Sequence, residues 1–446
     1  MKISQKFLRI QAGEAGIVFT MGAVLLINAL AQQISEITAI SNFLSEVGVN
    51  FILVVWMVDS VIILVTMGLQ SIIIDRFNRI NLVKWVIVAF LAAFLLMRLL
   101  YFTGAPDWLR YALLYLLAMQ QLVFFPVVFW ILANDIFDVA QAKRLFPLIT
   151  SFGFIGKLSG ILVSLLVPSL SQRFTFLRPE GLILMNAGFY LIILGLFYFG
   201  TRSIKLRTIT RMKESLVETL SEGWDFVREV PVFRYLSLSI LALLVCDVVI
   251  EFRFLVVSNE VFRDPASYQT FYATYSLALT IATILMQSLL TSRIISRLTI
   301  KNSFLIKPVS ALIGSSWMFL QSGLIGAIGG VVLLRFSQHA LDVPTRNTFL
   351  SLVPEERRGR VSIFNESYLY FVGILAGCLM TGAVVLLGIK LEIDSFYRLY
   401  LGISIILASA ATYAILKLRK SYDSSMLNWR LKRRQRGKSV LDQLEF

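Results

Sequence analysis

The chain has 446 residues, of which 57% are hydrophobic and 15% charged, with a net charge of +15 and a mean hydropathy of +0.77. A soluble chain of this length cannot bury so much apolar surface, so the composition excludes a string of soluble domains and requires lipid as the main solvent. Cys246 and Cys378 lie in apolar runs, and there is one histidine, which excludes a disulfide framework and leaves a zinc site without ligands. We expect no metal, no cofactor and no enzymatic activity.

Twelve apolar stretches are long enough to cross a bilayer as helices. They cover 14–40, 49–74, 83–103, 110–133, 147–169, 180–200, 233–257, 267–291, 303–322, 325–349, 361–388 and 395–416. We therefore predict an all-α integral membrane protein with about twelve transmembrane helices in two six-helix bundles. The predicted divisions are an N-terminal bundle (1–200), a cytoplasmic linker (201–232), a C-terminal bundle (233–417) and a basic cytoplasmic tail (418–446).

The basic residues predict the orientation. If the amino terminus is cytoplasmic, the cytoplasmic segments hold most of the 42 Lys and Arg residues and the outer segments hold five. This bias follows the positive-inside rule and places both termini in the cytoplasm. The net charge therefore indicates topology and attraction to the lipid bilayer rather than a nucleic-acid partner. We expect a multi-pass protein of a bacterial inner (plasma) membrane.

The first half carries polar residues at unusual depth. Asn28, Gln32 and Glu36 follow one another at steps of four in the first span, which predicts a polar face that reaches a cavity. Lys157 lies within the fifth span, where the small residues around it would let an anionic ligand approach closely. An ionisable group within a span is costly unless it meets a partner or a cavity, so each is a functional candidate.

The segment after the second span, 71–79, carries Asp75 and Arg76. It resembles the cytoplasmic loop motif of the major facilitator superfamily, with Ser71 and Asn78 where glycines are usual. The resemblance implies a major facilitator-like fold, in which two halves rock about a site at mid-membrane. An Asp and an Arg at a helix end can pair and latch the halves, so we predict a gating role for Asp75 and Arg76.

The central linker has an apolar stripe on one side. Its members, which recur at steps of three and four, are Ile209, Met212, Leu216, Leu220, Trp224 and Val227. We interpret the linker as an amphipathic helix on the cytoplasmic membrane face, and the alternative is a plain tether.

The second half holds the densest intramembrane charges. Asp247 and Glu251 lie one turn apart in the seventh span and could bind a cation or relay a proton. In the tenth span, Arg335, His339, Asp342 and Arg346 follow at steps of 4, 3 and 4, which on a regular helix places all four on one face. That face predicts a polar pathway. The alternative is an internal ladder in which the two arginines neutralise the aspartate and the histidine only packs.

The tail is strongly basic. Trp429 and the cations around it favour an anchor at the membrane interface, with the cations on anionic headgroups. The alternative is a docking segment for a cytoplasmic partner.

Three stretches share a second resemblance. The segment 129–148 contains Ala133-Asn134 and, nine residues on, Lys143-Arg144, and it resembles the hallmark of the ATP/ADP translocase (nucleotide transporter) family. The stretch that ends at Glu251 agrees with the same family. So does the stretch 342–347, which resembles the family's D-x-T-K-N pattern with Arg346 at its lysine and continues to Glu366.

The resemblance implies exchange of ATP for ADP, or nucleotide import with protons, with lysines holding the phosphates at mid-membrane. It places Asn134, Glu251 and Glu366 in the substrate site and Lys143 and Arg144 at the cytoplasmic gate. Two family lysines are replaced, because Ser35 and Ile374 occupy their positions.

Together these patterns predict a secondary active transporter that moves an anionic solute, such as a nucleotide or a phosphorylated or carboxylated metabolite, by alternating access. The predicted substrate-binding residues are Lys157, Glu251, Arg335, Asp342, Arg346, Asn134 and Glu366. The predicted proton-coupling residues are Glu251, Asp342 and His339, and the predicted gating residues are Asp75, Arg76, Lys143 and Arg144. The alternative is a non-transporting anchor, sensor or assembly protein that keeps the transporter fold.

Overall fold

The computed structural model describes residues 10–11, 13–73, 78–171, 173–202, 224, 227–228, 230–350 and 364–441. Its described part is helical, and it separates into two compact units: unit 1 holds 1–213 and 258–280, and unit 2 holds 214–257 and 281–446. Because the carboxyl end of α9 (Pro231–Val261) and the amino end of α10 (Pro265–Met286) cluster with unit 1, the two units do not divide at one point of the chain. Most of the predicted linker, 201–232, lies outside the described residues; of its apolar stripe, Trp224 and Val227 are described, and Val227 is buried in the core of unit 2.

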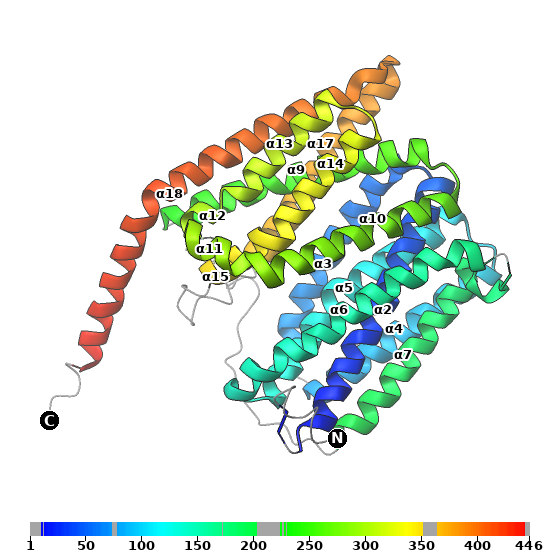
Figure 1. Cartoon of the computed structure of the whole chain (residues 1–446), viewed down its shortest axis with the longest axis horizontal. Coiled ribbons are helices and arrows are strands. Elements are labelled where there is room, and N and C mark those ends of the chain that lie inside the picture. Colours follow the sequence, from blue (N-terminus) through cyan, green and yellow to red (C-terminus); the bar gives the residue numbers. More distant parts are fainter. Residues whose placement is uncertain are drawn as a thin grey trace. The chain divides into compact units, whose positions relative to one another are not determined.

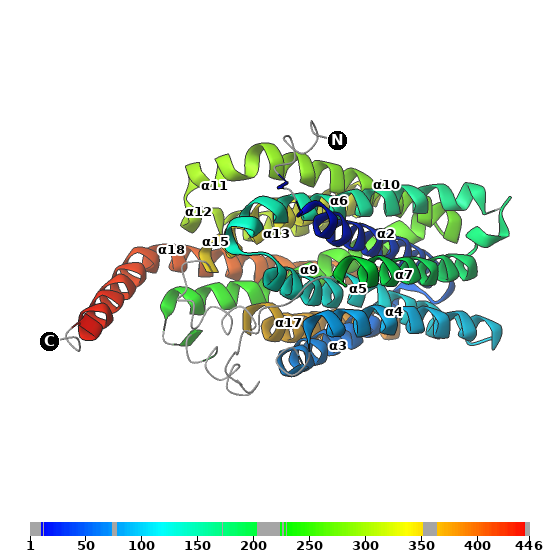
Figure 2. The ribbon, with the colours of Figure 1, turned by 90° about the horizontal axis from the view of Figure 1, so that it is seen from below.

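Unit 1 is built around its first long helix. The long helices of this unit are α2 (Ala15–Glu46), α3 (Ile52–Ile73), α4 (Arg79–Phe102), α5 (Asp107–Ile136), α6 (Val139–Leu170) and α7 (Pro179–Thr201). Helix α2 packs against α5, α6 and α7, and these helices run side by side in Figure 2. A Cβ added at Gly156 or Gly160 would lie 2.1 Å or 2.6 Å from a carbonyl oxygen of α2, so these glycines let α6 approach α2 closely.

A buried hydrogen-bond network ties α2 to its neighbours. The Tyr190 hydroxyl donates to the Asn28 side chain (2.7 Å), which in turn donates to the carbonyl of Gln121 (3.1 Å). The Gln121 side chain donates to the Tyr190 hydroxyl (3.0 Å) and closes the ring. In hydrocarbon such groups must find partners within the protein, so this part of the predicted polar face stabilises the fold.

Unit 2 contains more interrupted helices. It holds most of α9 (Pro231–Val261) and the last residues of α10 (Pro265–Met286), whose remaining residues cluster with unit 1. Its other described helices are α11 (Ser292–Leu298), α12 (Ile300–Ser303), α13 (Ile306–Leu320), α14 (Leu324–Ser337), α15 (Val343–Leu350), α17 (Leu369–Leu391) and α18 (Tyr397–Leu441). Three five-residue π-helical turns join some of them: η3 (Gln287–Thr291), η4 (Gln338–Asp342) and η5 (Phe364–Tyr368). Such turns insert an extra residue into a helix and are common at functional sites.

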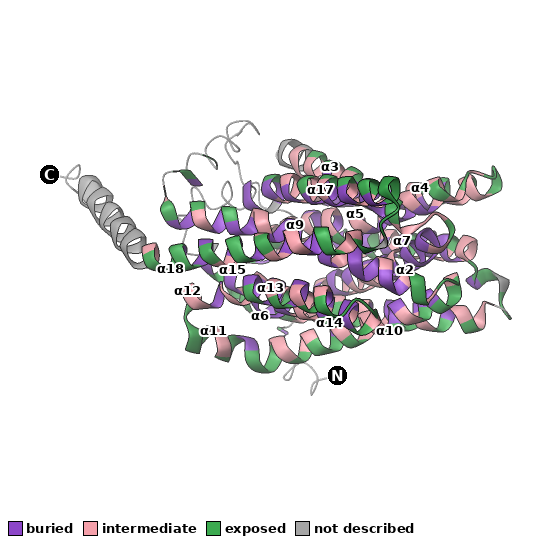
Figure 3. Ribbon diagram, turned by 90° about the horizontal axis from the view of Figure 1, so that it is seen from above, coloured by how far each residue is buried: buried purple, intermediate pink, exposed green. Residues whose placement is uncertain are grey.

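The helices have the length and composition of membrane spans. Among the described residues, eleven helices are long and apolar enough to cross a bilayer. Predicted span 233–257 corresponds to α9, which has 31 residues. Large apolar side chains such as Leu96, Leu191 and Ile406 are exposed (63%, 60% and 69%), and exposed residues follow the outer helix faces in Figure 3. Exposure of this kind fits contact with lipid, and the chain is a multi-pass membrane protein.

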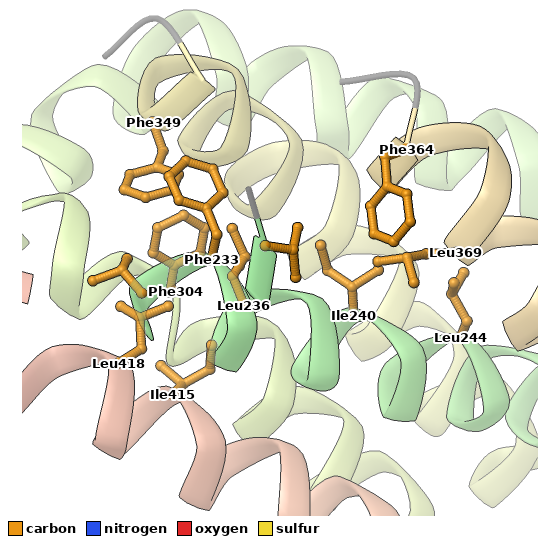
Figure 4. Packing of buried hydrophobic residues seen from close by; sticks show 12 residues of the cluster. Phe233, Leu236, Ile240, Leu244, Phe304, Phe349, Phe364, Leu369, Ile415 and Leu418 are labelled. Carbon is orange, nitrogen blue, oxygen red and sulfur yellow. The ribbon is translucent and has the colours of Figure 1, made fainter. Parts of the chain in front are cut away.

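Aromatic and aliphatic side chains form a packed core at one end of unit 2. The Phe233 and Phe349 rings lie 4.8 Å apart, and Phe304 packs edge-on against Phe349 at 5.4 Å. Figure 4 shows Ile415 and Leu418 of α18 reaching the same cluster. The core therefore joins α9, α15 and α18 at this end.

Helix α18 continues well past the predicted end of the twelfth span. It is a single helix of 45 residues to Leu441 (Figure 1), so most of the predicted tail, 418–446, is helical.

Candidate functional site

A pair of charges inside the predicted seventh and tenth spans is the centre of the candidate site. Nε and Nη2 of Arg335 on α14 lie 2.9 Å and 2.8 Å from Oε2 of Glu251 on α9, and Arg335 also donates to Gln338 at 3.3 Å. The Arg335 side chain is 28% exposed, whereas Glu251 is 12% exposed. The cation is thus the more accessible partner, which is the arrangement expected of a group that meets an anion.

A second pair lies on the other side of the π-turn η4. Nη2 of Arg346 is 3.0 Å from Oδ2 of Asp342, one turn away on the same segment. The side chain of Arg346 is 25% exposed and that of Asp342 is 10% exposed. Nε of Arg346 is buried and has no hydrogen-bond partner among the described residues, so the guanidinium keeps a spare donor.

The π-turn corrects the prediction of a single regular face for the tenth span. Residues 338–342 follow i→i+5 geometry, so the steps from Arg335 to Arg346 are not those of an α-helix. The structure therefore places three of the four residues in two separate ion pairs, Arg335 with Glu251 and Arg346 with Asp342. Half of the ladder alternative is present, because Arg346 pairs with Asp342, whereas Arg335 pairs with Glu251 of another helix.

Side chains of a neighbouring segment hold this π-turn. The Thr291 hydroxyl donates to the carbonyl of Ala340 (2.8 Å), and Nε2 of Gln287 donates to the carbonyl of His339 (2.9 Å). Both donors lie in the other π-turn, η3. The His339 side chain is exposed.

One buried ion pair was missed by the sequence analysis. Nζ of Lys307 on α13 lies 2.9 Å from Oδ2 of Asp247, and the two side chains are 5% and 7% exposed. Asp247 and Glu251 are thus not a joint cation site, because each has its own cation on a different helix. The sequence could have indicated this pair, because Lys307 stands within the predicted span 303–322, where a cation needs a partner.

A separate polar cluster belongs to unit 1. Glu36 accepts hydrogen bonds from Gln32 (2.7 Å) and Gln33 (2.9 Å). Glu36 is also the charged group that interacts electrostatically with Lys157. Lys157 therefore belongs to a polar cluster in which the carboxylate of Glu36 provides the opposite charge.

Both positions at which the family lysines are replaced lie in packed regions. Ser35 is 1% exposed, and its hydroxyl accepts from Asn186 (2.8 Å) while donating to the Ala31 carbonyl (2.9 Å). Ile374 packs against the aromatic core of unit 2. Neither residue supplies a charge to a phosphate.

The predicted gate residues have different positions. Arg144 pairs with Glu14 at 2.7 Å, Gln141 donates to the same carboxylate at 3.0 Å, and Lys143 is exposed. The Arg144 guanidinium, helped by hydrogen bonds, lowers the pKa of Glu14 from 4.5 to about 2. Asp75 and Arg76 lie outside the described residues.

An ion pair beside this gate was also missed. Arg79, at the first position of α4, pairs with Asp135 near the end of α5. Both belong to stretches that the sequence analysis had singled out.

The two remaining predicted residues contribute less to the described site. Asn134 is exposed and donates to the carbonyl of Trp130 at 2.8 Å, within its own helix. Glu366 lies in the π-turn η5, and its side chain is outside the described part of the chain.

Comparison with solved structures defines the fold. A variant of the nucleoside transporter NupG is 12% identical, with a TM-score of 0.63 over 90% of this chain and 98% of that one. The peptide transporter PepTSo of the POT family is 13% identical, with a TM-score of 0.60 over 90% and 98%. A bacterial homologue of the human lysosomal transporter Spinster is 13% identical, with a TM-score of 0.54 over 94% and 98%.

The chain has a major facilitator-type fold. This confirms the predicted fold class, including the all-helical bundles. No protein-family profile matches the chain. No curated protein matches it either.

Proposed function

We propose that this chain is a secondary active transporter that moves an anionic solute by alternating access. The observation that supports this best is the Arg335–Glu251 pair, a contact of 2.8 Å inside the predicted spans in which the arginine is more than twice as exposed as the carboxylate. A permanently closed structural pair has no need of an accessible cation. Transport by this chain would also fit the shared fold with transporters of nucleosides and peptides.

The chemistry of the pair suggests how an anion would bind. A phosphate or carboxylate can replace Glu251 on the fork of Arg335, because both present oxygens that accept two parallel N–H bonds. At an effective dielectric of about 20, one close charge pair is worth on the order of 4 kcal/mol, so the incoming anion compensates for most of the contact it breaks. The released carboxylate of Glu251 would then take up a proton, which couples anion and proton movement.

The Arg346–Asp342 pair would act as the second anion contact. The 25% exposure of the Arg346 side chain supports access of an anion to its guanidinium. His339, which is exposed on the same π-turn, would be a further proton-coupling residue beside this pair.

The substrate class follows from charge. Arg335 and Arg346 suit a nucleotide or a phosphorylated or carboxylated metabolite, whereas Ser35 and Ile374 supply none of the charge that the family's lysines give to a nucleotide's phosphates. Within unit 1, Lys157 remains a separate candidate for contact with an anion, beside Glu36. We favour a solute with one or two negative charges over a nucleoside triphosphate, and we expect both termini in the cytoplasm.

A thermal-shift screen on detergent-purified protein tests the binding half of this proposal. The panel contains nucleotides, phosphorylated sugars, dicarboxylates and their uncharged counterparts. Anions that bind the native state raise the melting temperature, by an amount set by their concentration relative to Kd. We expect the shift to vanish in Arg335→Gln and to persist in Lys390→Gln, which removes an exposed cation at the end of α17. A shift that is equal in both variants would contradict the proposal.

One observation favours the alternative of a non-transporting anchor or sensor. Helix α18 extends to Leu441, about 25 residues past the predicted twelfth span, as a docking segment for a cytoplasmic partner would. Under this alternative, a partner co-purifies in stoichiometric amount, is lost on truncation of 423–446, and is retained in Arg335→Gln. Under the transport proposal, the truncated protein still exchanges its solute.

A further inference from the structure

A cationic cavity lies on one side of α18, away from the ion pairs described above. It is an open hollow of about 430 Å³ between α12 and α18, and its lining residues are Lys301, Tyr413, Leu416, Lys417, Arg419 and Lys420. Four of these six side chains are cations and none is acidic. Such a lining selects for a ligand with negative charge.

The lining of the cavity changes from apolar to cationic along the axis of α18. Tyr413 and Leu416 are exposed (61% and 41%) and form its apolar wall, whereas three of the four cations follow within the next turn of α18 and Lys301 comes from α12. The ammonium group of Lys417 lies 5.4 Å from the centre of the Tyr413 ring. A ligand that fits this wall and these cations has an anionic head and an apolar body.

The aromatic core of unit 2 holds the cavity in place. Ile415 and Leu418 are 1% and 0% exposed and turn into that core, so the opposite face of α18 must present Leu416, Lys417 and Lys420 outward (Figure 4). On the other wall, Phe304 follows α12 and is 2% exposed in the same core. Both walls are therefore fixed by one cluster.

The backbone beside Lys301 is strained. Thr299, which precedes α12, has φ 66° and ψ 153°, a region that β-branched residues rarely adopt. The Ser303 hydroxyl and backbone N–H each donate to the carbonyl of Thr299 at 3.0 Å and hold this conformation. The strained residue thus sets the start of the short helix that brings Lys301 to the cavity.

We propose that this cavity is a binding site for the phosphate headgroup of an anionic phospholipid. The shared chemistry is a phosphate oxyanion held by the ammonium and guanidinium groups, and a free phosphate would offer the same oxyanion. The exposed Tyr413 and Leu416 wall assigns the site to a lipid, since a small hydrated phosphate gains nothing from an apolar surface. The cations also stand where the basic residues predict the cytoplasmic membrane surface, which carries anionic lipid.

Native mass spectrometry on the purified full chain tests the proposal. Phosphatidylglycerol is added to the protein in detergent micelles, with phosphatidylcholine as the zwitterionic probe. We expect retained phosphatidylglycerol and little phosphatidylcholine. The double variant K417Q/K420Q is expected to weaken phosphatidylglycerol binding on the order of thirtyfold, because each cation near the surface contributes about a fivefold factor.

The matched control is K390Q/R398Q, which also removes two exposed cations of unit 2, on α17 and on the first turn of α18. Its phosphatidylglycerol affinity is expected to stay within about twofold of the native value, since these cations do not line the cavity. An equal loss in both double variants would overturn the proposal and leave only general charge attraction. Displacement of the lipid by soluble glycerol phosphate at similar concentration would overturn the lipid assignment in favour of a free phosphate.

A second measurement uses the native chain, so it tests the proposal even if the double variant K417Q/K420Q does not fold. Phosphatidylglycerol with a photoactivatable group in its acyl chain is cross-linked, and the labelled peptides are sequenced. Labels on 413–420 support the proposal, and labels confined to other helices contradict it.

Discussion

The charged residues inside unit 2 have specific partners, and these partners determine what each residue can do. Glu251 and Asp247 stand one turn apart on α9. Glu251 pairs with Arg335, whose side chain is 28% exposed, whereas Asp247 pairs with the buried Lys307. An accessible pair can exchange a ligand, whereas a pair that is about 95% buried stabilises the packing of α9 against α13. We therefore assign function to Glu251 and stability to Asp247.

This assignment predicts the cost of breaking the buried pair. Asp247→Leu or Lys307→Met alone is expected to lower the unfolding free energy by about 3–5 kcal/mol, because each leaves an uncompensated buried charge. The double variant, with both charges removed, is expected to lie much closer to the native protein. Unfolding in mixed micelles measures the free energies of this double-mutant cycle. The control is Asp107→Asn, which breaks the Arg110–Asp107 pair; its aspartate is 48% exposed, so the expected loss is small. Additive losses in the double variant would contradict the assignment.

Glu14 predicts a pH dependence of stability. Its pKa falls from 4.5 to about 2 in the folded state, chiefly through the bond from Arg144, so the stabilisation is complete above pH 4.5 and is lost as the pH falls toward 2. The difference in melting temperature between the native protein and Glu14→Gln should thus be largest at neutral pH and shrink below pH 4.5. The same variant series with Lys143→Gln, an exposed neighbour, should show no such trend. A pH-independent difference would show that charge on Glu14 contributes nothing.

At the scale of elements, side chains of the π-turn η3 support the π-turn η4. Thr291 in η3 donates to a carbonyl in η4, and a buried carbonyl without a donor costs about 1–3 kcal/mol. We expect Thr291→Val to destabilise the protein by that amount. Thr274→Val on α10 is the control, because the exposed Thr274 hydroxyl bonds only to the carbonyl of Thr270 on its own helix. Equal melting temperatures for the two variants would argue against a supporting role for η3.

Close helix packing in unit 1 gives another element-scale prediction. A Cβ at Gly156 would lie 2.1 Å from the carbonyl oxygen of Leu26, whereas a Cβ at Gly188 on α7 meets nothing within 4 Å. Gly156→Ala should therefore lower the melting temperature, and Gly188→Ala should leave it unchanged or raise it, since alanine favours a helix by roughly 0.5–1 kcal/mol. The melting temperatures of the two purified variants, measured by heat unfolding, test this prediction. A neutral Gly156→Ala would mean that α2 and α6 are free to separate.

At the scale of the whole molecule, the sequence predicted the helices far better than their partners. Long apolar runs can only be spans in a chain of this composition, so the all-helical fold follows from residue type alone. The π-turn η4 could not be predicted, because the steps of 4, 3 and 4 assume a regular helix and nothing local signals the extra residue. The position of Lys307 within a predicted span signalled that it needs a partner, but only the tertiary contacts revealed that this partner is Asp247, and that Glu14 pairs with Arg144.

The central claim is that an anion crosses the membrane by way of Arg335. The most direct measurement is counterflow in proteoliposomes loaded with the anion that stabilises the protein most, with labelled anion outside. We predict exchange by the native chain and by Lys390→Gln, partial exchange by Arg335→Lys, and a loss of at least about thirtyfold in Arg335→Gln, which corresponds to about 2 kcal/mol. Exchange that is unchanged in Arg335→Gln, or the absence of anion exchange by the native chain, would contradict the account.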